Sequence, residues 1–405
     1  MSFINNLSNE LFLQIFGYLP PIDLLSACLV SHRWQASAEE LLYAEASLMT
    51  SFSNVNTLHE FLPTILSRPY LARRVRVLHL YWNLVRGDLP NVRENRDYTA
   101  ASIRFLGPNP PSDSNTLHVV LLLHLLSRLH TLHVLPPPND THSNPSTFID
   151  PHFHQLHSLR RFTCPRVTGR AGITPKELLH ILTLPSIRHV TTHMASGISM
   201  ATLDLNFFTT HYGTSPVTHL TLDYGRMCAS SLAHILHLPR ALTHLVYCDD
   251  PMLAARPDPA TFRLALECVR ETLESLKLGW WCPALVDGDG LSIGVIGPLR
   301  EWPALQSIQC TMMALLGERN VATGYLEDVL PVGVKRVYIE PGHGNWRGNH
   351  VVAWVKEMVE RKVDGAVPWL EEVSGGVGIL LEGGAGERFR ESCEAAGVLC
   401  QFRSR

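Results

Sequence analysis

Histidine is the residue type in this chain whose number and spacing point most directly to chemistry. The 405 residues include 21 histidines, and imidazole both binds transition metals and changes its charge near neutral pH. His189, His219 and His244 occupy the same place in successive copies of a short apolar pattern, and His193 and Asp223 occupy a later place. Neighbouring strands would set such side chains about 4.8 Å apart.

These rows have three readings: a metal site, a pH-sensitive binding face, or a row of neutral polar residues on an exposed sheet. No H-x-x-x-H pair with a nearby general base supports a metal site, so the row of polar residues is favoured. We expect neither a metal ion nor a cofactor.

Motifs typical of enzymes are missing from the sequence. There is no G-x-S-x-G elbow and no H-E-x-x-H helix. Asp287 and Asp289 alternate with glycines as in a calcium loop, but Pro298 stands at the glutamate position of such a loop. The glycine-rich stretch Pro341–Asn349 matches neither phosphate-binding spacing. We therefore expect no catalytic residue, and an α/β enzyme is the least favoured class.

Charge and hydropathy exclude further classes. The 34 basic and 37 acidic residues give a net charge of −3, which argues against nucleic-acid binding and against attraction to an anionic membrane. The longest apolar run, Leu117–Leu126, is shorter than the roughly 20 residues of a membrane span. The first ten residues lack the features of a secretory signal.

Nine cysteines are scattered along the chain without a C-x-x-C pair. Neither a disulfide framework nor a zinc finger is expected, so we expect reduced thiols and a location in the cytoplasm or nucleus.

A helical segment opens the chain. Leu11, Ile15 and Leu19 recur every four residues and predict one apolar helix face. Ser8 or Asn9 is a suitable N-cap, and Pro20 and Pro21 end the helix. Asp23 opens a second helix, and Ser31 is a suitable cap for a third. Three short helices cannot bury a full core by themselves, so this head needs a partner or the rest of the chain.

These residues resemble an F-box. The matching positions are Leu7, Glu10, Leu11, Ile15, Leu19, Pro20, Asp23, Leu24, Leu25, Val30, Arg33 and Trp34. Ser8 stands where the family usually has proline. The resemblance covers about 40 residues, and it implies a fungal-type F-box protein that docks on a Skp-type adaptor and, through it, on a cullin.

The resemblance also implies a function and a site. The chain would be the non-catalytic substrate-recognition subunit of a Skp–cullin–F-box ubiquitin ligase, with an unknown protein as its substrate. Carried over by position, the adaptor-binding residues would be Leu7, Ser8, Glu10, Ile15, Leu19, Pro20, Leu24, Leu25, Val30 and Trp34. The alternative is an interaction scaffold, without ubiquitin chemistry, whose head packs on its own repeats.

One apolar pattern returns through the rest of the chain. Its middle positions are Leu78, Leu132, Phe162, Val190, Leu220, Leu245, Leu276, Ile308 and Val337. The steps are 25 to 32 residues, except for a first step of 54, which predicts one degenerate repeat between residues 85 and 125. Helical stretches precede several copies. The expected fold class is α/β: a three-helix F-box followed by a leucine-rich-repeat-like solenoid with parallel strands. A closed or doubly wound α/β domain is the alternative.

The expected domains are a helical head, 1–48, and a solenoid, 49–405. Loops are expected at 86–116 and 136–147, and an atypical C-terminal cap at 365–405. In such an array the residues beside the buried strand positions face the partner. The substrate-binding residues expected on this face are Tyr81, His189, His219, Asp223, Lys277 and Tyr338. Trp280, Trp281 and Trp302 form either an aromatic patch for a partner or, as favoured, supports for the core.

Overall fold

The computed structural model describes the helical head and most of the repeat region. The described residues are 7–49, 57–81, 101, 104, 114–135, 156–165, 173, 175–193, 209–223, 229–248, 259–279, 296, 299–311, 315, 329–340, 348–375 and 391–402. The chain divides into two compact units, residues 1–192 and 193–405, and the division falls within a strand. Each unit is described by itself below.

The head consists of three helices, as expected: α1 (Asn9–Phe16), α2 (Pro21–Cys28) and α3 (His32–Ala44). Ser8 and Ser31 cap α1 and α3, because their hydroxyl oxygens accept hydrogen bonds from main-chain N–H groups three residues on. Proline fits the first position of α2, where its missing N–H leaves no bond unmade.

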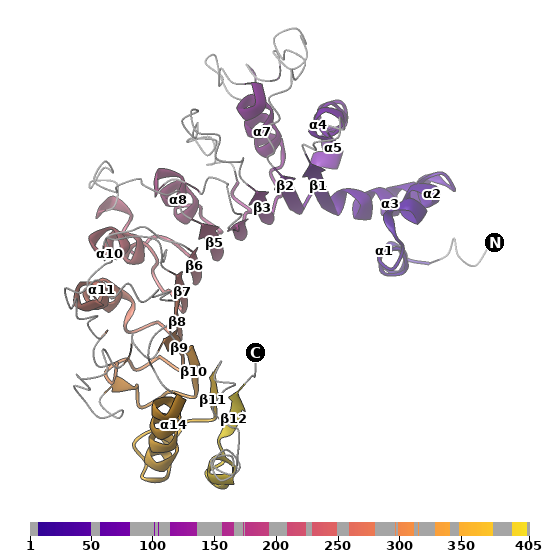
Figure 1. The fold of residues 1–405 in the computed structure, drawn as a ribbon. Helices are drawn as coiled ribbons and strands as arrows, with labels where there is room; N and C mark the ends of the chain where they lie inside the picture. The colour runs from indigo at the N-terminus through magenta and orange to yellow at the C-terminus, as the bar shows by residue number, and fades with distance from the viewer. Residues whose placement is uncertain are drawn as a thin grey trace. The chain divides into compact units, whose positions relative to one another are not determined.

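The first unit continues with a parallel sheet (Figure 1). Its further elements are β1 (Glu45–Met49), α4 (Thr57–Ser67), α5 (Pro69–Ala72), β2 (Val77–Tyr81), α7 (Ser114–Leu125), β3 (Thr131–Leu135), β4 (Arg161–Cys164), α8 (Pro175–Leu182) and β5 (His189–His193). Strands β1 to β5 pair in chain order, and every pairing is parallel.

The prediction of a degenerate repeat between residues 85 and 125 is wrong. Leu78 of β2 lies directly opposite Leu132 of β3, so no strand separates them. The 54-residue step therefore belongs to one long connection that includes α7. Most of the loop expected at 86–116, and all of that at 136–147, lies outside the described residues.

The second unit repeats the same plan. Its elements are β6 (His219–Asp223), α10 (Ala229–His237), β7 (His244–Cys248), α11 (Pro259–Leu266), η5 (Glu267–Val269), β8 (Ser275–Gly279), β9 (Ser307–Thr311), β10 (Arg336–Glu340), α14 (Gly348–Val363), β11 (Glu372–Gly375) and β12 (Leu399–Phe402). The strands again pair in chain order and in parallel.

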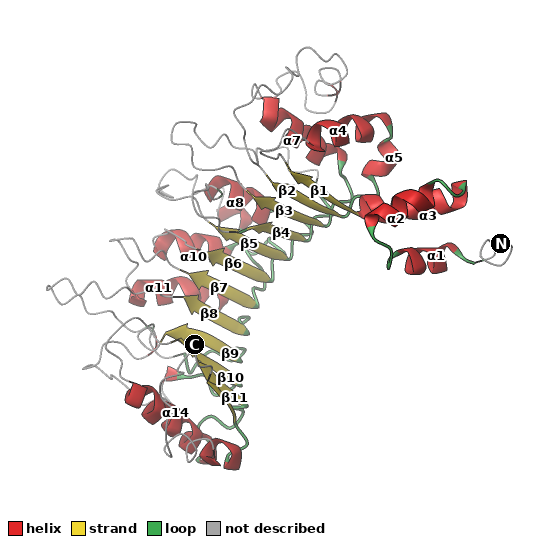
Figure 2. Ribbon diagram, turned by 45° about the vertical axis from the view of Figure 1, so that its right-hand side comes forward, coloured by secondary structure: helices red, strands yellow, loops and turns green. Residues whose placement is uncertain are grey.

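Burial alternates along the strands. The nine middle positions of the apolar pattern are at most 1% exposed, whereas the strand residues on either side are half-buried or exposed. Burying each such side chain contributes about 1.5–3 kcal/mol. Helices cover one face of the strands in each unit, and the opposite face, called the bare face below, carries none of the described helices (Figure 2).

This arrangement confirms the α/β solenoid. A doubly wound domain would reverse its strand order at a switch point, and neither unit does so. Strands β1 and β11 were not expected. None of the described helices is long and apolar enough to cross a membrane.

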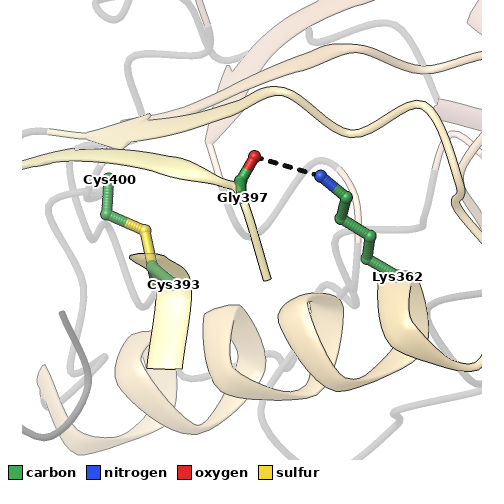
Figure 3. Close-up of a disulfide and its surroundings, with 4 residues drawn as sticks. All are labelled: Lys362, Cys393, Gly397 and Cys400. Atoms are coloured by element: carbon green, nitrogen blue, oxygen red, sulfur yellow. Dashed lines mark hydrogen bonds between the residues drawn. A yellow bond between two sulfur atoms is a disulfide. The ribbon is translucent and has the colours of Figure 1, made fainter. Parts of the chain in front are cut away.

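The C-terminal cap contains a feature that the scattered cysteines did not suggest. Cys393 and Cys400 form a disulfide that ties a helical turn at 391–395 to β12 (Figure 3). Gly397 ends that turn with a φ of 63°, a left-handed conformation that suits glycine. Its carbonyl accepts a 3.1 Å hydrogen bond from Lys362 Nζ of α14. The expectation that no disulfide occurs is therefore corrected for this pair.

Candidate functional site

An aromatic cluster forms the small core of the head. The rings of Phe12 and Phe16 on α1 lie 5.6 Å apart, and Trp34 of α3 packs on both at 6.0 and 5.3 Å. Phe12 and Phe16 are 1% and 3% exposed. Leu24 and Ala27 of α2 and Ala38 of α3 complete this cluster, with Leu7, Leu19, Cys28, Leu41 and Leu42 packed at its edge.

Arg33 ties the start of α1 to the start of α3. Its guanidinium lies 5.0 Å from the centre of the Phe12 ring and donates hydrogen bonds to the Leu7 carbonyl and to Asn9 Oδ1. Glu10 lies in the first turn of α1, where hydrogen bonds from backbone N–H and from Ser8 lower the pKa of its carboxyl. The contacts of Arg33 and of Glu10 fix the start of α1 without using the outer apolar side chains of that helix.

The outer surface of α1, α2 and the turns that follow them is unusually apolar. Seven large apolar side chains there are at least 44% exposed: Leu11, Ile15, Tyr18, Ile22, Leu25, Leu29 and Val30. Tyr18 and Leu29 reach 90% and 88%. We call these seven residues the apolar surface. Large apolar side chains exposed in this number on one short segment are typical of a protein-binding site.

The structure divides the ten adaptor-binding residues expected from the sequence into two groups. Ser8, Glu10, Ile15, Pro20, Leu25 and Val30 are exposed. Leu24 is 6% exposed and lies in the head's core, and Leu7, Leu19 and Trp34 pack against that core. Leu24 thus belongs to the head's core, and the adaptor contact expected for it stays a prediction.

Four members of the apolar surface were absent from that expected set: Leu11, Tyr18, Ile22 and Leu29. Leu11 and Tyr18 are apolar residues flanking the stripe that packs inward. Because α1 and α2 carry apolar residues on several faces, periodicity alone did not separate the inner side from the outer one.

The six substrate-binding residues expected on the repeats all lie on the bare face at half-buried strand positions. In the first unit these are Tyr81 on β2 and His189 on β5. In the second unit they are His219 and Asp223 on β6, Lys277 on β8 and Tyr338 on β10. Tyr338 and Lys277 lie on either side of Gln309 in the strand pairing.

Histidine rings stack in pairs on this face. His219 and His244 lie opposite each other, with ring centres 4.1 Å apart. His79 and His133 form a second pair at 4.5 Å, and His79 Nε2 lies 2.9 Å from Glu45 Oε1. Burial, and then the nearby His79 and Arg161, lower the pKa of His133, while Glu45 acts in the opposite sense.

Among the described residues, neither pair belongs to a group that could hold a metal ion. Within the part of the chain that the structure describes, no three His, Cys, Asp or Glu side chains gather around a point that could hold an ion. Trp302 is 1% exposed and belongs to the core, while Trp280, Trp281, Asp287 and Asp289 lie outside the described residues.

Comparison with protein families finds a match in the head. Residues 4–48 match the F-box-like family model. The comparison with curated proteins finds no match. The matched segment includes α3 and all but the last residue of β1, so α3 leads straight into the sheet.

Side chains fix the F-box-like head on the first repeat. Arg74 Nη1 donates a 2.6 Å hydrogen bond to the Ala36 carbonyl of α3, and Tyr70 Oη lies 3.3 Å from Glu39 Oε2. Tyr43 of α3 stacks on Phe61 of α4. These contacts engage α3 alone and leave the apolar surface of α1 and α2 open.

Proposed function

We propose that this chain is the substrate-recognition subunit of a Skp–cullin–F-box ubiquitin ligase. The observation that carries the proposal is the apolar surface, since seven large apolar side chains stay exposed on a head that already has its own aromatic core. A Skp-type adaptor would cover this surface, and a cullin would join through the adaptor.

The head's packing favours this role over the scaffold alternative. A scaffold whose head folded onto its own repeats would bury the outer side chains of α1 and α2. Instead, the described contacts between the head and the first repeat come from α3, while Leu25 and Leu29 are 54% and 88% exposed.

The repeats would hold the protein substrate. We propose that they are related to leucine-rich repeats, and that Tyr81, His189, His219, Asp223, Lys277 and Tyr338 contribute to the bare face used for binding. Such a subunit needs no catalytic group, because holding the substrate near a ubiquitin-charged enzyme raises its effective concentration. We place this activity in the cytoplasm or nucleus.

Co-expression with a Skp-type adaptor, followed by size-exclusion chromatography, tests the proposal. A 1:1 complex is expected for the wild-type chain and for Leu264→Asp, since Leu264 is an equally apolar residue, 72% exposed, on α11. Leu25→Asp should abolish the complex while leaving the chain monodisperse. A monodisperse wild-type chain that forms no complex would favour the scaffold instead.

A further inference from the structure

A row of basic residues follows the edge of the sheet in the first unit where the strands begin. Arg76, His130, Arg160 and Arg188 immediately precede β2, β3, β4 and β5. The N–H groups of the last three each donate a 2.8 Å hydrogen bond to the carbonyl of the preceding member. These hydrogen bonds make the four residues consecutive rungs, here called the basic ladder.

Two further arginines enlarge the positive surface. Arg161 follows Arg160 and lies opposite Thr131 and His189 in the strand pairing. Arg128 lies in the turn before β3. Arg128, Arg160 and Arg161 are all exposed, and none of the ion pairs among the described residues includes them. Their charges are therefore not neutralised by a neighbouring carboxylate in the described structure.

The positive charges of the basic ladder act on the imidazole of His130. Burial lowers the pKa of its imidazole first, and the positive charges of Arg76 and Arg160 on either side lower it further. Two cations on adjacent rungs thus act on one side chain between them. A bound anion would relieve this repulsion.

The equivalent positions in the second unit show no excess of basic residues. They are Thr218, Thr243, Glu274, Gln306, Lys335 and Glu371, joined by the same main-chain hydrogen bonds. The wider sequence shows the same contrast: residues 57–192 contain 15 Arg or Lys against 8 Asp or Glu, although the whole chain has a net charge of −3. The positive charge is therefore a local property of the first repeats.

We propose that the basic ladder binds an extended, acidic segment of a protein rich in Asp or Glu. Three strand spacings of about 4.8 Å give the ladder a length of about 14 Å, and same-side carboxylates in an extended peptide recur about every 6.6 Å. Two or three carboxylates would thus meet four rungs, and arginine forks suit carboxylates. The net negative charge of the chain disfavours nucleic acid as the occupant.

This inference deepens the proposed function, since it rests on that function for naming the segment as part of a substrate. Binding itself does not depend on the adaptor. It can therefore be tested with the full chain, alone and in the presence of the adaptor, so that failure of one proposal is distinguishable from failure of the other.

The test measures fluorescence anisotropy of a labelled seven-residue peptide of alternating glutamate and serine. Further probes are the same peptide with glutamine for glutamate, the peptide with phosphorylated serines, and a single-stranded oligothymidine of matched charge. The ladder variant is Arg160→Glu/Arg161→Glu. Its matched control is Lys335→Glu/Arg336→Glu, which makes the same charge change on the equivalent rung and first strand residue of β10.

The expected result is binding of the glutamate peptide, at least tenfold weaker binding of the glutamine peptide, and at least a tenfold loss in the ladder variant. The control should change binding less than twofold, and both variants should still bind the adaptor. Arg160→Gln/Arg161→Gln should give an intermediate loss, which guards against misfolding of the charge-reversed variant.

Four outcomes would overturn the proposal. They are equal binding of the glutamate and glutamine peptides, an equal loss in the control variant, binding of the phosphorylated peptide alone, and binding of oligothymidine as tight as that of the glutamate peptide. If the glutamate peptide binds as expected but the adaptor does not, the result supports the basic ladder as a peptide-binding site and contradicts the ubiquitin-ligase role.

Discussion

His79 and His133 lie opposite each other on adjacent strands, with their ring centres 4.5 Å apart and their planes within 5° of parallel. Glu45 on β1 reaches His79 from the other side, with its Oε1 2.9 Å from Nε2. Three neighbouring strands thus contribute one row of titratable groups, in a region where the sequence pattern predicted an intervening repeat. The row exists because β2 and β3 pair directly.

This row predicts a pH dependence of stability. Burial, His79 and Arg161 lower the pKa of His133 below the usual histidine value of 6.5, against the opposing effect of Glu45. As pH falls through that value, the unfolded chain takes up a proton at this residue more readily than the folded chain, so the free energy of unfolding decreases. His133→Gln should reduce the fall in Tm between pH 7.5 and 5.5. An unchanged fall would contradict this assignment.

The head's core predicts which substitutions unfold it. Phe16 is 3% exposed and packs edge-on against Trp34 at 5.3 Å. Phe16→Ala should cost about 3–5 kcal/mol of stability, measured as rapid proteolysis of the α1–α3 segment. Tyr18→Ala is the matched control, because Tyr18 is 90% exposed; its effect on stability should be below about 0.5 kcal/mol. Similar proteolysis of both variants would show that the aromatic core is misassigned.

The junction between the head and the repeats predicts a local effect. Arg74→Met keeps most of the aliphatic stem but loses the charged hydrogen bond to the Ala36 carbonyl. Removing a bond of this kind costs about 1.5–3 kcal/mol, so amide hydrogen exchange within α3 should become faster. Arg73→Met is the control, because Arg73 is exposed beside it. Equal exchange rates in the two variants would mean that Arg74 does not brace the head.

The sequence predicted the strands well because their cause is local. Each middle position of the apolar pattern is at most 1% exposed, and alternation along a strand leads directly to burial on one face. β1 was missed because it follows α3 without a turn and offers only Ala46 and Leu48 as buried residues.

The site was only partly predictable for a different reason. In the head, neighbouring apolar residues such as Ile15 and Phe16 lie on different sides of α1, at 49% and 3% exposure. Helical periodicity identifies an apolar stripe but not which of two stripes is covered by α2 and α3. Leu24 was expected to bind the adaptor because its position matches the F-box pattern, whereas Tyr18, Ile22 and Leu29 match no position of that pattern and were left out. The rungs of the basic ladder likewise became neighbours only through strand pairing.

Isothermal titration of the full chain with a Skp-type adaptor tests the central claim most directly. The wild-type chain should bind with 1:1 stoichiometry. Ile15→Ala/Leu25→Ala should weaken binding by about 30-fold or more, since two central apolar contacts of about 1 kcal/mol or more each are lost. Leu264→Ala, which truncates an exposed leucine on α11, should bind within about twofold of wild type. Unchanged affinity of the double variant would contradict the assignment of the apolar surface as the adaptor-binding site.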